Sequence, residues 1–123
     1  MAGTVTVRAQ HLPEPPTIVL RFSWLSDASG DADLITPLEY NGTISRACFI
    51  PDGAAAPTDL YDVTVLDEDG CDVLDGQGAD RSATLKQAIV GFGEVMGQKL
   101  QLVVANAGNA KEGVVVLHVR RDI

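Results

Sequence analysis

The stretch TIVLRFSW (residues 17–24) decides the fold class, because large apolar residues occupy every second position along it. On an extended chain these residues share one face: Ile18, Leu20, Phe22 and Trp24. A hydrophobic period of two is the spacing of a β-strand that buries one face, whereas an amphipathic helix has a period near 3.6. The stretch therefore predicts a strand of an antiparallel sheet with one face in the core.

The same alternation recurs on both sides of this stretch, in short runs that are rich in β-branched residues. The clearest runs are TVTVRA (4–9), YDVTVLD (61–67), LQLVVA (100–105) and VVVLHVR (114–120). TISRACFI (43–50) is a weaker strand, and DLITPLEY (33–40) is predicted at a sheet edge because Pro37 cannot donate to a ladder. Turn sequences such as NG, PDG and DEDG separate the runs.

This pattern predicts an all-β fold, an antiparallel β-sandwich of about seven or eight strands, with jelly-roll and Greek-key topologies both open. Only residues 82–96 (SATLKQAIVGFGEVM) suggest a helix. Ser82 is a suitable N-cap there, but Gly91 and Gly93 interrupt the helical pattern. We therefore expect at most one short helix.

The length of 123 residues predicts a single domain, residues 1–123, that buries a core without metals or disulfides. The proline-rich PEPP (13–16) predicts a stiff, polyproline-like segment. We therefore expect residues 1–16 to include an extended N-terminal arm, with residues 1–12 free to reach a neighbouring subunit.

The net charge of −8 argues against two classes of partner. Affinity for nucleic acid comes largely from cations that displace counterions from phosphates, and anionic membranes attract cations in the same way. The nine Lys and Arg residues are scattered along the chain. No run approaches the ~18–20 apolar residues of a membrane span, and the first residues lack the pattern of a signal peptide. We expect no nucleic-acid binding, no membrane association and no export.

The acidic run YDVTVLDEDGCDVLDG (61–76) has two interpretations. Asp69-Gly70 is a strong hairpin signal, since both central residues of such a turn need positive φ. We therefore predict paired strands at residues 63–66 and 71–74 around an acidic tip. A calcium loop would start at Asp67, but its twelfth position is then Gly78, which has no side chain to offer. The metal candidates Asp67, Asp69 and Asp72 are accordingly weak.

No other residues form a recognisable catalytic or cofactor site. Cys48 and Cys71 fit neither a zinc pattern nor a CxxC motif. We expect reduced thiols that serve as small apolar residues, and a disulfide stays open if the fold brings the two cysteines close. His11 and His118 lie far apart in the chain, and nothing resembles a nucleophile elbow or a phosphate-binding glycine loop. We predict a protein that is not an enzyme and takes no cofactor.

The last predicted strand has a second apolar face. Val115, Leu117 and Val119 form its core face, and the opposite face carries Val114, Val116 and His118. If nothing in the domain covers that opposite face, it is an interface for another protein. The alternative is a strand central in the sandwich and buried on both sides.

Two segments resemble small proteins encoded among the virion structural genes of tailed bacteriophages. They are PTDLYDVTVLDEDGCDVLDGQGADRS (57–82) and LQLVVANAGNAKEGVVVLHVR (100–120). The resemblance implies a non-enzymatic particle component, a β-sandwich decoration (cement) protein that stabilises the head shell through contacts with the major capsid protein or other virion proteins. It also implies a homo-oligomer, located in the virion and assembled in the bacterial cytoplasm.

Two alternatives stay open at this point. The first is a tail, baseplate or adaptor component of the same particle. The second, from another class, is a calcium- or carbohydrate-binding β-sandwich module, which needs ordered carboxylates within residues 67–80 and solvent-facing aromatics. Only Tyr40 and Tyr61 are candidates for that aromatic platform.

Overall fold

The computed structural model describes residues 3–14, 16–90 and 94–121, and these residues form nine β-strands and no helix. No helix long and apolar enough to cross a bilayer occurs in this part of the chain. The strands are β1 (Thr4–Pro13), β2 (Pro16–Leu25), β3 (Ala32–Ile35), β4 (Tyr40–Pro51), β5 (Asp62–Leu66), β6 (Gln87–Val90), β7 (Glu94–Gln98), β8 (Gln101–Ala105) and β9 (Glu112–Arg120). The prediction of an all-β antiparallel sandwich is confirmed.

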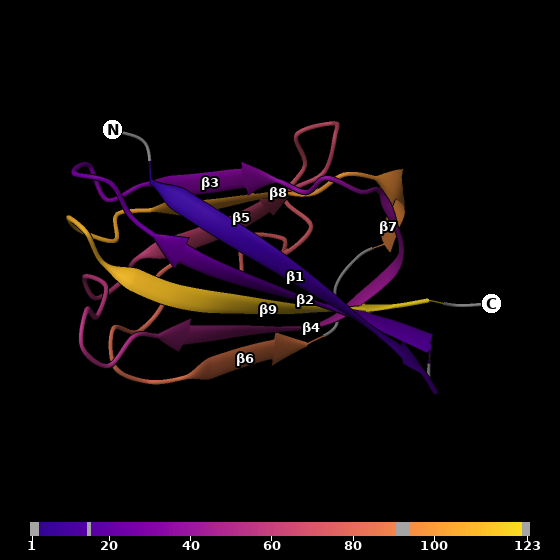
Figure 1. Cartoon of the computed structure of the whole chain (residues 1–123), viewed down its shortest axis with the longest axis horizontal. Coiled ribbons are helices and arrows are strands. Elements are labelled where there is room, and N and C mark those ends of the chain that lie inside the picture. The colour runs from indigo at the N-terminus through magenta and orange to yellow at the C-terminus, as the bar shows by residue number, and fades with distance from the viewer. Residues whose placement is uncertain (1–2, 15, 91–93, 122–123) are drawn as a thin grey trace.

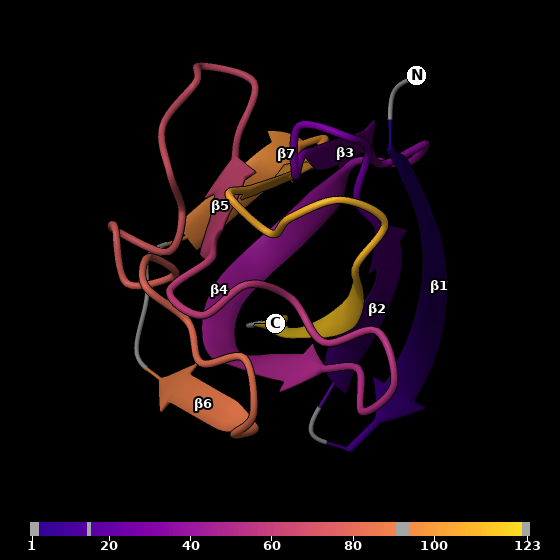
Figure 2. The ribbon, with the colours of Figure 1, turned by 90° about the vertical axis from the view of Figure 1, so that its left-hand side faces the viewer.

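The strands form two sheets packed face to face (Figures 1 and 2). Sheet A has the order β1-β2-β9-β4-β6, with β7 also paired to β4, and sheet B has the order β3-β8-β5. From β2 to β5 each successive strand changes sheet, and early strands pair with late ones, β2 with β9 and β3 with β8. This alternation is similar to the strand order of a jelly roll, but sheet B has three strands, so the architecture shown is a two-sheet antiparallel β-sandwich. As predicted, the strand before Pro37 lies at a sheet edge.

The core lies between the inner faces of the two sheets. The large residues of the decisive stretch TIVLRFSW are all buried in it, and cross-strand neighbours on β9 continue their rows: Leu20 opposite Leu117, and Phe22 opposite Val115. Trp24 lies opposite Gly113, and a Cβ atom on that glycine would come within 2.5 Å of the indole ring. The ring of Trp24 also packs on Tyr61, with centroids 5.6 Å apart. The rings of Trp24 and Tyr61 thus pack together in the core, and Gly113 leaves the space that the indole ring occupies.

The N-terminal segment is a strand of the domain rather than a free arm. Residues 4–13 pair with β2 along their whole length, and Pro13 lies opposite Pro16. The expected arm is therefore wrong for these residues, because backbone hydrogen bonds to β2 hold them. Residues 8–14, the second half of β1 and Glu14, are exposed on both faces, whereas Ile18 and Leu20, which lie opposite on β2, are buried in the core. Pro15 lies outside the described residues.

Residues 82–96 contain no helix in their described part. Ser82 still acts like a cap, since its Oγ accepts hydrogen bonds from the backbone N–H groups of Thr84 (3.2 Å) and Leu85 (3.0 Å). After this turn the chain forms β6 and β7, and both strands pair with β4. Pairing with β4 thus prevails over a local helix propensity that glycine already weakens. Residues 91–93 lie outside the described part.

Candidate functional site

The acidic run does reverse the chain, but by a different turn from the one predicted. Gly70 has a φ of 81°, whereas Asp69 stays at negative φ. The turn therefore fits a three-residue loop in which only the last residue is left-handed. One carboxylate oxygen of Asp67, Oδ1, accepts hydrogen bonds from the backbone N–H groups of Asp69 (2.9 Å) and Cys71 (3.0 Å). The side chain of Asp67 thus holds the tip together.

The return strand predicted for residues 71–74 is wrong, and Asp72 explains why. Its Oδ1 accepts from the N–H groups of Val65 (3.2 Å) and Leu74 (3.0 Å), and its Oδ2 accepts from Gly76 (2.8 Å). These bonds turn the chain again, so the ribbon is reduced to one bridge between Leu66 and Asp72. Here a side-chain carboxylate replaces the ladder partners that a second strand would have provided.

The three metal candidates, Asp67, Asp69 and Asp72, do not converge on a common point. Asp67 and Asp72 bind their own backbone, and Oδ2 of Asp69 accepts from Nε2 of Gln98 at 3.3 Å. Among the described residues there is no group of three or more His, Cys, Asp or Glu side chains that could hold a metal ion. In this structure the carboxylates organise turns.

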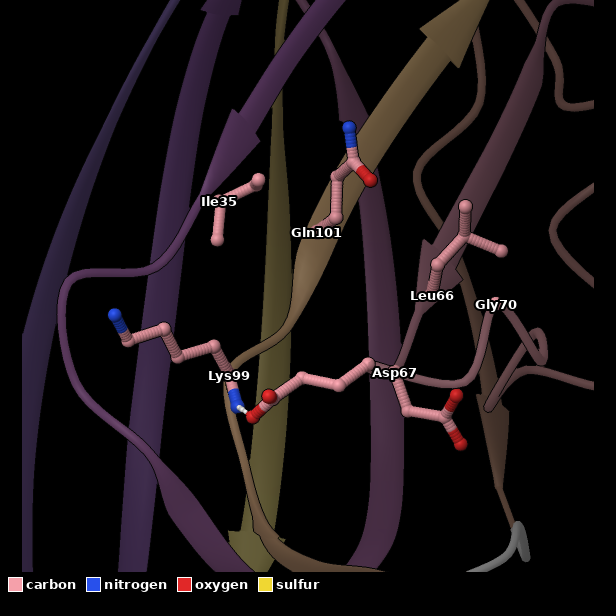
Figure 3. A pocket seen from close by; sticks show the side chains of 7 residues that line it. Ile35, Leu66, Asp67, Gly70, Lys99 and Gln101 are labelled. Carbon is pink, nitrogen blue, oxygen red and sulfur yellow. Dashed lines mark hydrogen bonds between the residues drawn. The ribbon is translucent and has the colours of Figure 1, made fainter.

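A shallow groove of about 480 Å³ lies beside the acidic turn, on the outer face of sheet B. Figure 3 shows its floor at Gln101, with Ile35 on one side and Leu66 on the other. At one end Glu68 accepts a hydrogen bond from the backbone N–H of Lys99 at 2.8 Å. The groove combines the apolar side chains of Ile35 and Leu66 with the carboxylates of Asp67 and Glu68.

We call the outer face of sheet B, together with this turn, the acidic face. The strand register places its members on the side away from the core: Asp33, Ile35, Asp62, Leu66, Gln101 and Val103, with Asp67, Glu68 and Asp69 at the turn. Oδ2 of Asp33 accepts from Gln101 (3.2 Å), and Oδ2 of Asp62 accepts from Asn106 (2.6 Å). Both donors are neutral amides, so these hydrogen bonds bring no positive charge to the two carboxylates.

The predicted interface residues Val114, Val116 and His118 lie together on the outer face of β9. The sequence left two alternatives open for this face, an interface for another protein or a strand buried on both sides, and the structure has features of each. The strand is central in sheet A, between β2 and β4, and Val116 is only 5% exposed. Val114 and His118 are half-buried, and no strand of the described part of the chain lies over this face (Figure 1).

Arginines surround this apolar stripe, which the sequence alone did not reveal. Arg8 on β1 lies directly opposite Arg21 on β2, and Arg46 on β4 lies directly opposite His118 on β9. Burial and the neighbouring Arg46 charge both lower the pKa of His118. We call this outer face of sheet A the basic face; its members are Arg8, Val19, Arg21, Arg46, Val114, Val116, His118 and Arg120.

Within the described part of the chain, two buried aromatic side chains each hold a polar atom without a hydrogen-bond partner. They are Nε1 of Trp24 and the hydroxyl of Tyr61. Burial raises the pKa of Tyr61 to about 12. Tyr61 therefore cannot serve as a solvent-facing platform for a sugar, and the aromatic surface needed by a carbohydrate-binding module is further reduced.

The two cysteines are free and lie apart in the fold. Cys48 is half-buried on the outer face of β4, opposite Val116. Cys71 is exposed beside the acidic turn, so its expected role as a small apolar residue is wrong. Its backbone takes part in the turn, and its thiol faces solvent.

Comparison of the chain with protein-family models, with curated proteins and with solved structures gives no match.

Proposed function

We propose that this chain is a non-enzymatic structural protein of a tailed-bacteriophage virion, a decoration protein that stabilises the head shell through protein–protein contacts. The observation that supports this most is the basic face. It is a sheet surface whose centre holds the half-buried Val19 and Val114 beside Val116, which is 5% exposed, and no strand of the described residues covers it. Exposed surfaces that combine an apolar centre with a charged rim are typical of protein interfaces.

Three further features agree with this role. The strand order is similar to that of a jelly roll, an architecture used by viral capsid domains, although that is an analogy of fold. The core is closed by large buried side chains on both sheets, which suits a protein that must remain folded on a particle surface. The net charge of −8 keeps such a protein from binding the packaged nucleic acid. The sequence resemblance to virion proteins is the reason for proposing a phage particle as the partner.

The proposal is tested on purified particles of the phage that encodes the chain. We expect the protein in many copies per particle by quantitative mass spectrometry, and heat-sensitive shells when it is absent. Adding back the purified protein should restore heat resistance. Protein that never co-purifies with particles would contradict the virion role, while a few copies at one vertex or in the tail would favour the tail or adaptor alternative.

A matched pair of variants connects the test to the basic face. Arg46→Glu reverses a charge on the basic face, close to Val116. Lys86→Glu makes the same charge change at an exposed site in the segment between β5 and β6. If the basic face contacts the shell, Arg46→Glu restores heat resistance poorly and Lys86→Glu restores it like the wild type. Equal restoration by both variants would exclude this face as the shell contact.

A further inference from the structure

The two outer faces of the sandwich carry opposite charge. Four of the nine basic residues lie on the basic face, and the carboxylates that the described residues bring to it stand near the ends of strands, at Glu94 and Glu112. The long segment between β5 and β6, which begins with the acidic turn, projects from the side of sheet B (Figure 2). A chain with a net charge of −8 thus keeps one face positive.

The cations of the basic face are not neutralised within the described part of the chain. Arg8, Arg21 and Arg46 are exposed, and none of them has an ion-pair partner among those residues. Like charges directly opposite each other on neighbouring strands are unfavourable, and this face has two such pairs, Arg8 with Arg21 and Arg46 with His118 when the imidazole is protonated. A hollow of about 450 Å³ beside Arg8 and Arg21 is open to an incoming group.

The acidic face offers the complementary arrangement. Ile35, Leu66 and the half-buried Val103 form an apolar centre, and Ile35 is 57% exposed. Asp33 and Asp62 flank that centre on β3 and β5. An apolar centre with a carboxylate rim therefore lies on one side of the molecule, and an apolar centre with a guanidinium rim lies on the other.

We propose that the protein self-associates head to tail, with the basic face of one copy on the acidic face of the next. Each contact then buries two apolar centres against each other and pairs the unneutralised arginines with carboxylates. Because the two faces differ, the contact is heterologous; it closes into a ring or continues as a filament, depending on the rotation between copies. This contact does not depend on the virion role and can be tested on the purified chain alone.

A nucleic acid would fit the basic face less well than a second copy. The centre of that face is aliphatic, with Val19, Val114 and Val116, and none of its described residues offers an exposed aromatic ring on which bases could stack. The acidic remainder of the chain would also repel a polyanion. A second copy supplies carboxylates and apolar groups together.

The experiment is sedimentation velocity over a range of concentrations, at low and high salt, with two complementary variants. Arg21→Glu alters only the basic face, and Asp33→Arg alters only the acidic face. Lys86→Glu and Glu14→Lys repeat the two charge changes at exposed sites outside both apolar centres. All four positions are exposed, and thermal unfolding confirms that each variant is folded.

We expect the wild type and both controls to sediment faster as concentration rises, and this trend to weaken with salt. Arg21→Glu and Asp33→Arg should each lower the association constant by at least about tenfold. An equimolar mixture of these two variants should form a one-to-one complex, because it still contains one intact face of each kind.

Three results would overturn the proposal. The first is a wild-type protein that stays monomeric at every concentration and salt. The second is an association that Arg21→Glu removes and Asp33→Arg leaves unchanged, which would mean a contact between two basic faces. The third is a mixture of the two variants that remains monomeric.

Discussion

The two faces of β9 come from one alternating sequence and have different surroundings. Val115, Leu117 and Val119 are fully buried against sheet B, whereas Val114, Val116 and His118 face outward among arginines. Both faces are rich in valine, so apolar character alone does not distinguish core from surface. What distinguishes them is the presence of a second sheet on one side only.

The largest effect should separate the two faces directly. Leu117→Ala removes a fully buried side chain and should lower the free energy of unfolding by about 2–5 kcal/mol. Val114→Ala removes two methyl groups from a half-buried side chain on the outer face, and its cost should be no more than about 1 kcal/mol. Urea unfolding monitored by circular dichroism measures both. Equal losses would show that the outer face is covered in the same way as the core.

A smaller effect tests how the inner face closes beside β9. Gly113→Ala places a methyl group where the ring of Trp24 lies and should cost about 1–3 kcal/mol through overpacking. Gly53→Ala is the matched control, because a Cβ atom there meets nothing within 4 Å. Thermal unfolding with tryptophan fluorescence reports both the stability and the ring environment. An unchanged melting temperature for Gly113→Ala would contradict the close packing of ring on backbone.

Tyr61 provides a third test of the inner face, because its hydroxyl is buried without a partner. Tyr61→Phe should raise stability by about 1 kcal/mol, since an unpaired polar group leaves the core. The folded pKa of about 12 lies above the usual value near 10, so the unfolded chain loses its proton first. Stability of the wild type should therefore fall as pH rises from about 10 to 12.

Urea titrations across that pH range compare the two proteins. The fall in stability should be smaller in Tyr61→Phe than in the wild type. Identical pH profiles would indicate that the Tyr61 hydroxyl is already accessible to solvent in the folded protein.

The smallest effect concerns His118 on the outer face. Burial and Arg46 lower its folded pKa, so below about pH 6.5 the unfolded chain binds the proton more readily and stability is lost as pH falls. Arg46→Gln should raise the pKa of His118, which nuclear magnetic resonance titration of the imidazole measures. A pKa that does not change in the variant would mean that the two groups do not interact.

The sequence predicted the sandwich because its signals are local. The alternation in residues 17–24 depends only on which side chains share a face, and all four of its large apolar residues are in the core. The acidic run was predicted to reverse direction, and it does. The return strand predicted for residues 71–74 does not form, because Asp72 accepts hydrogen bonds from three backbone N–H groups. The alternation of apolar and polar residues carries no information about such bonds.

The basic face could not be predicted, because it is produced by pairing between distant strands. Arg8, Arg21 and Arg46 are scattered along the chain and become neighbours only through the register of β1, β2, β9 and β4. The alternation did place Arg21 and His118 on the non-core side of their strands. It gave no information on which strands would be adjacent. For the same reason the helix suggested for residues 82–96 gave way to strands that pair with β4.

The most direct test of a contact between the basic face and the acidic face is a concentration series of amide chemical shifts on the uniformly labelled wild-type protein. If the two faces contact each other, we expect the shifts to change together in two separate sets. One set lies around Val116 on the basic face, and the other lies around Ile35 and Asp33 on the acidic face. Changes confined to one of these sets, or spectra that stay the same from dilute to concentrated protein, would contradict it.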